Sequence, residues 1–258
     1  DVGGTFTDIV AVSDSGTVTF SKAASTPNDP SIGVMNAVER LADELGINSE
    51  TLLSKTESIV HGTTVATNAL LERKGAKTGL LTTLGHRDVL EMREGLKDDR
   101  YNMRFPAPAP LVPRFLRLGV RERIKPDGRI HTELDNTSLD EAINKLREEK
   151  VTSVAVCYLH AYKEPKHEQE TKQILEAKLP GVSVSISSEV FPEIKEYERV
   201  STTIVNAYVR PIVENYLNRL EERLKNAGYK GSVLIILSHG GVAPIEEAIR
   251  LSAATVLS

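Results

Sequence analysis

The alternation of short apolar runs with longer helical patterns is the feature that most constrains this fold. Apolar runs at 77–83 and 151–159 have the length and β-branched content of buried strands, and a further apolar strand is expected at 232–237. Helical apolar spacing occupies segments between them, including 28–46 and 139–150. A chain that alternates buried strands with helices favours an α/β fold in which helices flank a mixed sheet.

The first fifty residues predict a hairpin followed by a helix. Residues 8–13 and 16–25 read as paired strands joined by the turn "DSG". The helix within 28–46 has a capping residue, Asp29, at its start and Gly46 after its last turn. Its expected buried stripe is Val34, Val38, Leu41 and Leu45.

The middle of the chain predicts less regular structure. Residues 96–124 contain four closely spaced prolines, which indicate a long surface excursion. Helicity resumes after Ser138, which with Glu141 forms a capping-box pattern. The helix within 165–179 is mostly polar and is expected to be a solvated surface helix, and 182–188 alternates like a half-exposed strand.

A change in composition near residue 190 suggests a domain boundary, with one domain at 1–190 and a second at 191–258. The second opens with a long helical region, 189–228, which Pro211 is expected to kink or divide.

Composition excludes several functional classes. The net charge of −4 and the lack of a basic stripe argue against nucleic acid as a partner. The longest apolar run, "VLIIL", is too short to span a membrane, and no signal-peptide pattern is visible. Cys157 has no second cysteine to pair with, so a buried thiol in a reducing, cytoplasmic setting is expected.

The opening octet "DVGGTFTD" is the strongest candidate for a phosphate site. The chain has no P-loop pattern and no Rossmann glycine fingerprint. A turn at Gly3 and Gly4 lets backbone amides approach phosphate oxygens, and Thr5 and Thr7 add hydroxyl donors. The octet begins with Asp1 and ends with Asp8, and these two carboxylates offer oxygen ligands for Mg²⁺. The structural alternative is an ordinary hairpin turn.

"HGTT" follows an apolar strand, a position where α/β proteins often bind ligands. His61 could relay a proton, or it could simply hydrogen-bond the turn. Both readings stay open. Candidate cleft residues in the same stretch are Thr63, Thr64, Thr67 and Asn68.

Two further segments carry candidates. "DVLEMREG" holds Asp88 and Arg93, and Arg93 could clamp a carboxylate or phosphoryl group or form a surface ion pair. "SHGG" is a second glycine turn after a strand, with the alternative of a plain strand-ending turn. Its candidates are His239, Gly240 and Gly241.

The octet resembles the first phosphate motif of the actin, sugar-kinase and Hsp70 ATPase superfamily. Two longer stretches are more specific, "HGTTVATNALLERKGAKTGLLTTLGHRDVLEMRE" and "EYERVSTTIVNAYVRPIVENYL". With them the chain is similar, over nearly its whole length, to the hydantoinase A/5-oxoprolinase/ketone carboxylase family. The resemblance implies an actin/ribonuclease H-like ATPase fold. Because family members carry a strand before the octet and a further glycine-rich segment later, it also implies a fragment truncated at both ends and inactive by itself.

The resemblance implies a subunit of an ATP-dependent amidohydrolase that opens a cyclic amide of the hydantoin, oxoproline or lactam type. ATP with Mg²⁺ would phosphorylate the carbonyl, His61 or Asp88 would handle the proton, and a second, hydantoinase B-like subunit would complete the reaction. The alternatives are an ATP-dependent ketone carboxylase subunit, a small-molecule kinase, or a non-catalytic ATP-gated scaffold subunit.

Overall fold

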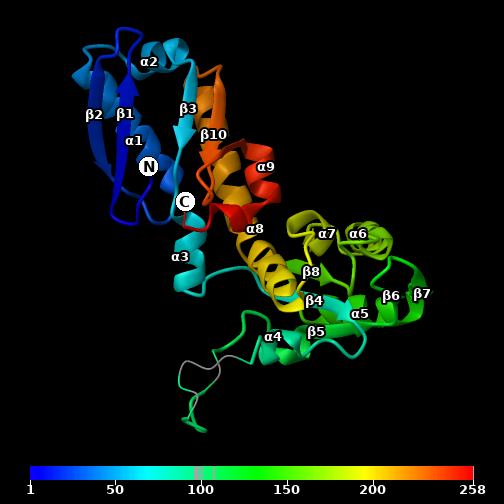
Figure 1. Cartoon of the computed structure of the whole chain (residues 1–258). Helices are drawn as coiled ribbons and strands as arrows, with labels where there is room; N and C mark the ends of the chain where they lie inside the picture. Colours follow the sequence, from blue (N-terminus) through cyan, green and yellow to red (C-terminus); the bar gives the residue numbers. More distant parts are fainter. Residues whose placement is uncertain (96–98, 100, 107, 258) are drawn as a thin grey trace. The chain divides into compact units, whose positions relative to one another are not determined.

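The computed structural model describes residues 1–95, 99, 101–106 and 108–257. It is a mixed α/β protein with parallel and mixed sheets flanked by helices, as the alternation predicted (Figure 1). The chain divides into two compact units, one formed by Asp1–Lys74 with Ile212–Ser258 and the other by Gly75–Pro211. The domain boundary expected between residues 190 and 191 stays a prediction.

The first unit begins with the predicted hairpin and helix. Strands β1 (Phe6–Val12) and β2 (Val18–Ala24) pair antiparallel, and α1 (Pro30–Glu44) packs against them (Figure 1). Asp29 caps α1 as predicted, accepting a hydrogen bond from the Ser31 amide at 3.2 Å. The prediction that Leu45 belongs to the buried stripe of this helix was wrong. Leu45 is 41% exposed because α1 ends at Glu44, one residue before it.

A three-stranded sheet completes the first unit. Its order is β11 (Val242–Pro244), β10 (Ser232–Ile236), β3 (Ser58–His61), and β10 runs parallel to β3 and antiparallel to β11. Its helices are α2 (Ser49–Lys55), α3 (Val65–Leu71), α9 (Ile245–Arg250) and the short 3-10 helix Ser252–Thr255.

The opening segment joins the hairpin to this sheet. Val2 forms one bridge with Thr7 and another with Thr63. The glycine turn therefore lies beside the carboxyl end of β3.

The second unit is built on a parallel sheet of four strands. The order is β5 (Arg117–Val120), β4 (Thr78–Thr83), β8 (Ser153–Cys157), β9 (Ser183–Ile186). Every residue of β4 and β8 is buried, as their apolar runs predicted. The other elements are α4 (Val89–Met92), the 3-10 helix Arg114–Leu116, β6 (Arg123–Ile124), β7 (Ile130–Thr132), α5 (Asn136–Glu148), α6 (Lys166–Lys178) and α7 (Ser187–Val190).

Several expectations for the second unit were wrong. The segment expected to be an excursion ends in β5, a strand of the main sheet; its residues 96–98, 100 and 107 lie outside the described residues. Helix α5 is capped by Asp135 rather than Ser138. Strand β9 is mostly buried, and α6 is not a purely solvated helix, because Glu168 is fully buried.

Helix α8 (Glu196–Asn226) runs for 31 residues, and Pro211 lies inside it. The proline therefore does not divide the helix, although the boundary between the two units falls just after it. The free thiol of Cys157 is buried as predicted, and burial raises its pKa to about 12. Within the described ranges, no helix is long and apolar enough to cross a membrane.

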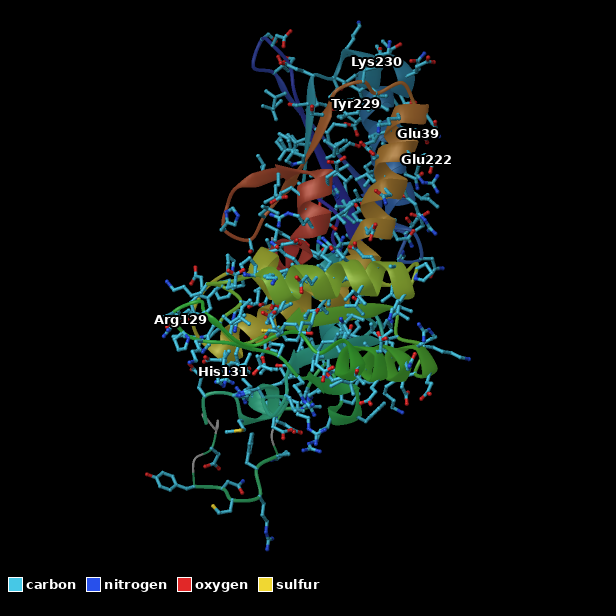
Figure 2. The ribbon with its side chains drawn as sticks, turned by 90° about the vertical axis from the view of Figure 1, so that its right-hand side faces the viewer. Glu39, Arg129, His131, Glu222, Tyr229 and Lys230 are labelled. Carbon is cyan, nitrogen blue, oxygen red and sulfur yellow. The ribbon has the colours of Figure 1, made fainter. Side chains whose placement is uncertain are left out.

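The described residues hold no group of three or more histidines, cysteines or acids that could bind a metal ion. His131 lies on β7 near Arg129 and is exposed (Figure 2).

Candidate functional site

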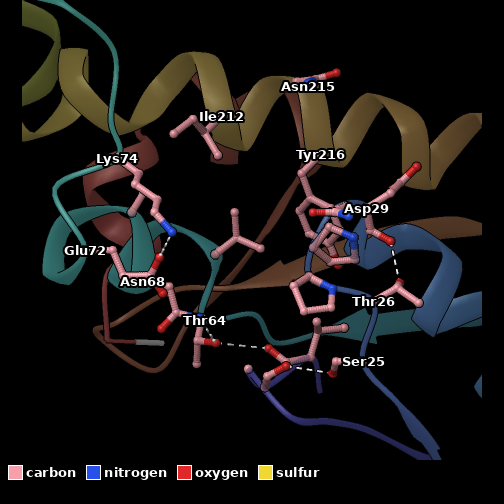
Figure 3. Close-up of a pocket in the computed structure, with 18 of the residues that line it drawn as sticks. Ser25, Thr26, Asp29, Thr64, Asn68, Glu72, Lys74, Ile212, Asn215 and Tyr216 are labelled. Carbon is pink, nitrogen blue, oxygen red and sulfur yellow. Dashed lines mark hydrogen bonds and ion pairs between the residues drawn. The ribbon is translucent and has the colours of Figure 1, made fainter.

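A cavity of about 380 Å³ lies within the first unit (Figure 3). Four segments far apart in the sequence line it: the opening turn, the loop before α1, the α3 region and the second half of α8. The lining residues are Val2, Gly3, Gly4, Ser25, Thr26, Pro27, Asn28, Asp29, Pro30, Thr64, Val65, Asn68, Ala69, Glu72, Lys74, Ile212, Asn215, Tyr216 and Arg219.

The glycine turn forms one wall of this cavity. The Gly3 amide donates to the Phe6 carbonyl at 3.0 Å, and the Ser25 hydroxyl donates to the Gly3 carbonyl at 2.7 Å, which holds the turn in place. Among the described residues, no acceptor takes the amides of Gly4 and Thr5. A turn with amides left free beside a cavity can bind an anion.

Gly4 also lies close to the first turn of α3. A Cβ atom added at Gly4 would lie 3.9 Å from the amide nitrogen of Asn68. The Thr64 amide and hydroxyl both donate to the Val2 carbonyl at 3.2 Å, and Asn68 donates to the Thr64 hydroxyl at 3.2 Å. The sequence candidates Gly3, Gly4, Thr64 and Asn68 therefore come together here.

Charged residues that the sequence reasoning missed line the same cavity. Lys74 pairs with Glu72 at 2.6 Å (Figure 3). Asp29 lies 3.6 Å from Arg219 of α8. Burial alone would raise the pKa of Asp29, but hydrogen bonds from Ser31 and Arg223 outweigh it and lower the pKa. The only signal for this wall was the turn-rich stretch "STPNDP" at 25–30.

The threonines and acids of the octet point in several directions. Thr7 is buried, with its hydroxyl 3.1 Å from that of Ser25, and it does not line the cavity. Asp8 forms an ion pair with Lys22 at 3.0 Å, on the solvent side of the hairpin. Thr5 and Asp1 are exposed, and an Asp1 carboxylate oxygen lies 3.4 Å from where a Cβ of Gly62 would be.

His61 lies behind the cavity rather than in its wall. The side chain is 4% exposed, and its Nε2 atom lies 2.7 Å from the hydroxyl of Tyr216, which does line the cavity. Burial of the ring lowers the pKa of His61 to about 3. The imidazole is therefore neutral at physiological pH.

The remaining candidates of the first unit lie outside the cavity wall. Thr63 is buried, and its hydroxyl accepts from the Val65 amide at 3.2 Å. Thr67 accepts from the Leu257 amide at 2.9 Å. The "SHGG" turn joins β10 to β11, where the Gly241 amide donates to His239 at 3.3 Å and Gly240 has a φ of 87°.

Asp88 and Arg93 belong to the second unit. Asp88 is held by Arg114 in a two-bonded ion pair at 3.0 and 3.1 Å, and this pairing lowers the pKa of Asp88. Arg93 ends α4 and lines a second cavity, which lies wholly within the second unit.

Comparison with known proteins identifies several relatives. The chain is 40% identical to caprolactamase subunit alpha of Pseudomonas jessenii over 95% of its own length and 35% of the relative's. It is 36% identical to the acetophenone carboxylase gamma subunit of Aromatoleum aromaticum, over 95% of the chain and 35% of the relative. The chain thus spans about a third of the length of these curated relatives.

Solved structures share the fold. The crystal structure of the ATP-dependent caprolactamase of P. jessenii matches 95% of this chain, and 36% of its own, with a TM-score of 0.87 and 40% identity. The nucleotide-free structure of acetone carboxylase matches 100% of this chain, and 38% of its own, with a TM-score of 0.90 and 27% identity.

Family models cover most of the chain. The model of the hydantoinase/oxoprolinase N-terminal region matches residues 1–179, and the hydantoinase/oxoprolinase model matches residues 199–258. These matches agree with the resemblance seen in the octet and in the two longer stretches. The chain belongs to the hydantoinase/oxoprolinase family.

Proposed function

We propose that this chain is part of an ATP-dependent enzyme that opens a cyclic amide through phosphorylation of its carbonyl oxygen. The observation that carries the proposal is the first cavity, where a glycine turn with free amides meets Thr64, Asn68 and Lys74. The relative named as an ATP-dependent caprolactamase supports this reading, because a caprolactam is a cyclic amide.

The glycine turn would bind the terminal phosphates of ATP. The amides of Gly4 and Thr5 offer hydrogen-bond donors to the phosphate oxygens. A Cβ atom at either glycine of the turn would reduce the space through which those oxygens approach the amides. Lys74 supplies a cation at the cavity wall, which a phosphate could draw away from its exposed partner Glu72. Phosphoryl transfer depends mainly on such positioning and neutralisation of charge.

The residues present fit Mg²⁺ in part. Mg²⁺ is usually held by one or two carboxylates together with water and phosphate oxygens, so a cluster of three acids is not needed. Asp1 is exposed beside the turn, whereas Asp8 would first have to leave Lys22. We therefore assign Asp1 as the main candidate ligand and Asp8 as the weaker one. When bound, Mg²⁺ would neutralise phosphate charge.

The reaction proceeds in three steps and consumes two waters. The amide oxygen attacks the terminal phosphorus of ATP, and the bond to ADP breaks. Water then adds to the activated carbon and the carbon–nitrogen bond breaks, which frees the amine and leaves an acyl phosphate. A second water hydrolyses the acyl phosphate, so that inorganic phosphate is released and the product is a ring-opened amino acid. Of the two sequence candidates for moving the proton, His61 could act on the first cavity only through Tyr216, and Asp88 belongs to the second unit.

We further propose a cytoplasmic enzyme with a second, hydantoinase B-like subunit. Relatives are named as alpha, beta and gamma subunits, which supports an assembly of more than one chain.

The test is substrate-dependent turnover by the full-length protein with its partner subunit. We expect release of ADP and inorganic phosphate in equal amounts when a lactam, hydantoin or 5-oxoproline is added. Formation of ADP with a stable phosphorylated product and no free phosphate would indicate a small-molecule kinase instead. ATP binding without stimulation by any compound of the panel would indicate a non-catalytic, ATP-gated scaffold.

Ketone carboxylation is a second candidate, because the acetophenone and acetone carboxylase subunits match nearly the whole chain. In that reaction ATP would activate an enol oxygen or the carbonyl of bicarbonate. Turnover that requires both a ketone and bicarbonate, with no response to cyclic amides, would favour this candidate over ring opening.

A further inference from the structure

The second unit contains a cavity of about 490 Å³ that the proposed reaction does not use. It lies where α4, β6, the end of β8 and the start of α8 meet. The polar side chains that matter for its chemistry are His86, Arg93, Arg123, His160, Lys195 and Glu196.

Several residues that line this cavity have a strained backbone conformation. Six described residues other than glycine have a positive φ, and three of them line it. They are Arg93, His160 and Lys195, with φ values of 53°, 58° and 77°. Such conformations are unfavourable for residues that carry a Cβ atom, and they tend to occur at ligand sites. Their presence here suggests that the side chains are held in place for a purpose other than stability.

The cations of the cavity differ in how they are paired. Lys195 is neutralised by Glu198 at 3.0 Å and Glu94 at 3.8 Å. Arg123 donates to Nε2 of His86 at 3.0 Å, so its partner is a neutral ring rather than a carboxylate. In the described part of the chain, the Arg93 guanidinium has neither a hydrogen-bond acceptor nor an ion-pair partner, although the Arg93 backbone amide donates to the Val89 carbonyl. Two guanidinium groups therefore face the cavity without a carboxylate.

One acid of the cavity is also free. Glu196, the first residue of α8, has no cationic partner among the residues that the structure describes. Its carboxylate and the Arg123 guanidinium both act on the rings of His86 and His160, which places these groups around one space. The pKa of each histidine is lowered, first by burial and then by Arg123, so both rings are neutral donors or acceptors.

We propose that this cavity binds a small zwitterionic amino acid, with its carboxylate on Arg93 and Arg123 and its ammonium on Glu196. Guanidinium groups bind a carboxylate with paired, charge-assisted hydrogen bonds. A doubly charged phosphate fits less well, because Glu196 would repel it. Opening a lactam produces an amino acid of this kind; the identification of the ligand as a reaction product rests on the proposed function, but the binding itself does not.

The experiment is calorimetric titration of the full-length protein without ATP, using 6-aminohexanoate, hexanoate, hexylamine and inorganic phosphate as probes. We expect 6-aminohexanoate to bind at least about tenfold more tightly than hexanoate or hexylamine, since each of these lacks one charged contact. Equal binding of hexanoate, or tighter binding of phosphate, would overturn the zwitterion assignment.

Variants test the residues. Arg93→Gln, Arg123→Gln and Glu196→Gln should each weaken 6-aminohexanoate binding about tenfold or more. Lys150→Gln is the matched control, because Lys150 has the same φ of 53° in the same unit and lies outside the cavity. Unchanged affinity in folded Arg93→Gln and Arg123→Gln proteins, with melting temperatures near that of the control, would contradict the proposal. Because the assay contains no ATP, its outcome is independent of whether the chain supports cyclic-amide turnover.

Discussion

Nε2 of His61 and the hydroxyl of Tyr216 lie 2.7 Å apart, although 155 residues separate them in the sequence. The histidine ends β3 and is buried, whereas the tyrosine comes from α8 and lines the first cavity. The contact ties the sheet beside the glycine turn to the long helix. It also means that the ring reaches the cavity only through the tyrosine.

This contact predicts that His61→Gln lowers stability more than it lowers activity. Removing the ring leaves the buried Tyr216 hydroxyl with a poorer partner, which costs about 1–3 kcal/mol. We expect a lower melting temperature and a turnover per folded molecule within about threefold of wild type. A loss of about 10²–10⁴-fold, the usual effect of removing a general acid or base, would instead restore His61 as a proton relay. Both quantities should be measured on one preparation.

The buried ring also predicts a pH dependence of stability. The pKa of His61 is lowered to about 3 in the folded protein, against about 6.5 in an unfolded chain. The unfolded state therefore binds more protons between these values, and the free energy of unfolding falls as pH drops below 6.5. Between pH 7 and 5 the wild type should lose about 2 kcal/mol more than His61→Gln, measured by urea unfolding. An equal decrease in the free energy of unfolding of the two proteins between pH 7 and 5 would contradict the proposed effect of the buried His61 ring.

Local signals allowed several elements to be predicted from the sequence. Helix α1 was placed well because each of its signals acts locally at one helix end: a capping Asp29 and a proline at the start, and a glycine after the end. Strand β5 was missed because Arg117 interrupts its apolar pattern. Its guanidinium is nevertheless buried, donating to the Val112 carbonyl at 2.9 Å and to Glu91 at 3.0 Å.

The residues that line the first cavity were predictable only in part, because some of them come together through contacts between distant segments. Gly3, Gly4, Thr64 and Asn68 were found because the glycine turn and the strand end carry short motifs. The contributions of Lys74, Asn215 and Arg219 depend on which face of α8 and which end of α3 meet the turn. Such contacts between distant segments leave no periodic pattern in the sequence.

Helix α6 supplies a prediction about stability. The Glu168 carboxylate is fully buried and accepts from the Tyr158 amide at 2.9 Å, the Ser188 amide at 2.8 Å and the Ser187 hydroxyl at 2.6 Å. Glu168→Ala leaves these donors unpaired and should destabilise the protein by about 3–5 kcal/mol. Glu176→Ala, at an exposed position of the same helix, should change the melting temperature little. Similar small effects in both variants would refute the role given to Glu168.

The two acids of the octet should differ in their effect on ATP turnover. Asp1→Asn removes the exposed carboxylate beside the turn, and we expect turnover to fall about 10²-fold or more with little change in melting temperature. Asp8→Asn breaks a surface ion pair with Lys22, so its effect should be within about threefold. Raising the Mg²⁺ concentration should partly rescue Asp1→Asn if its carboxylate holds the metal. Equal losses in both variants would show that Asp8 leaves Lys22 to bind the metal as well.

Gly4 provides the most direct test of the phosphate site. A Cβ at this position would lie 3.9 Å from Asn68, so Gly4→Ala can be accommodated without a clash, and φ at Gly4 is not in the left-handed region. Gly4→Val adds two methyl groups that must project into the cavity or against Asn68, where phosphate oxygens would approach the free amides. We expect Gly4→Val to abolish ATP binding and Gly4→Ala to weaken it about tenfold or less, with melting temperatures within a few degrees of wild type. Calorimetric titration of both variants with ATP measures this graded loss. If Gly4→Val bound ATP as tightly as the wild type, the glycine turn would be an ordinary hairpin connection and the phosphates would have to bind elsewhere.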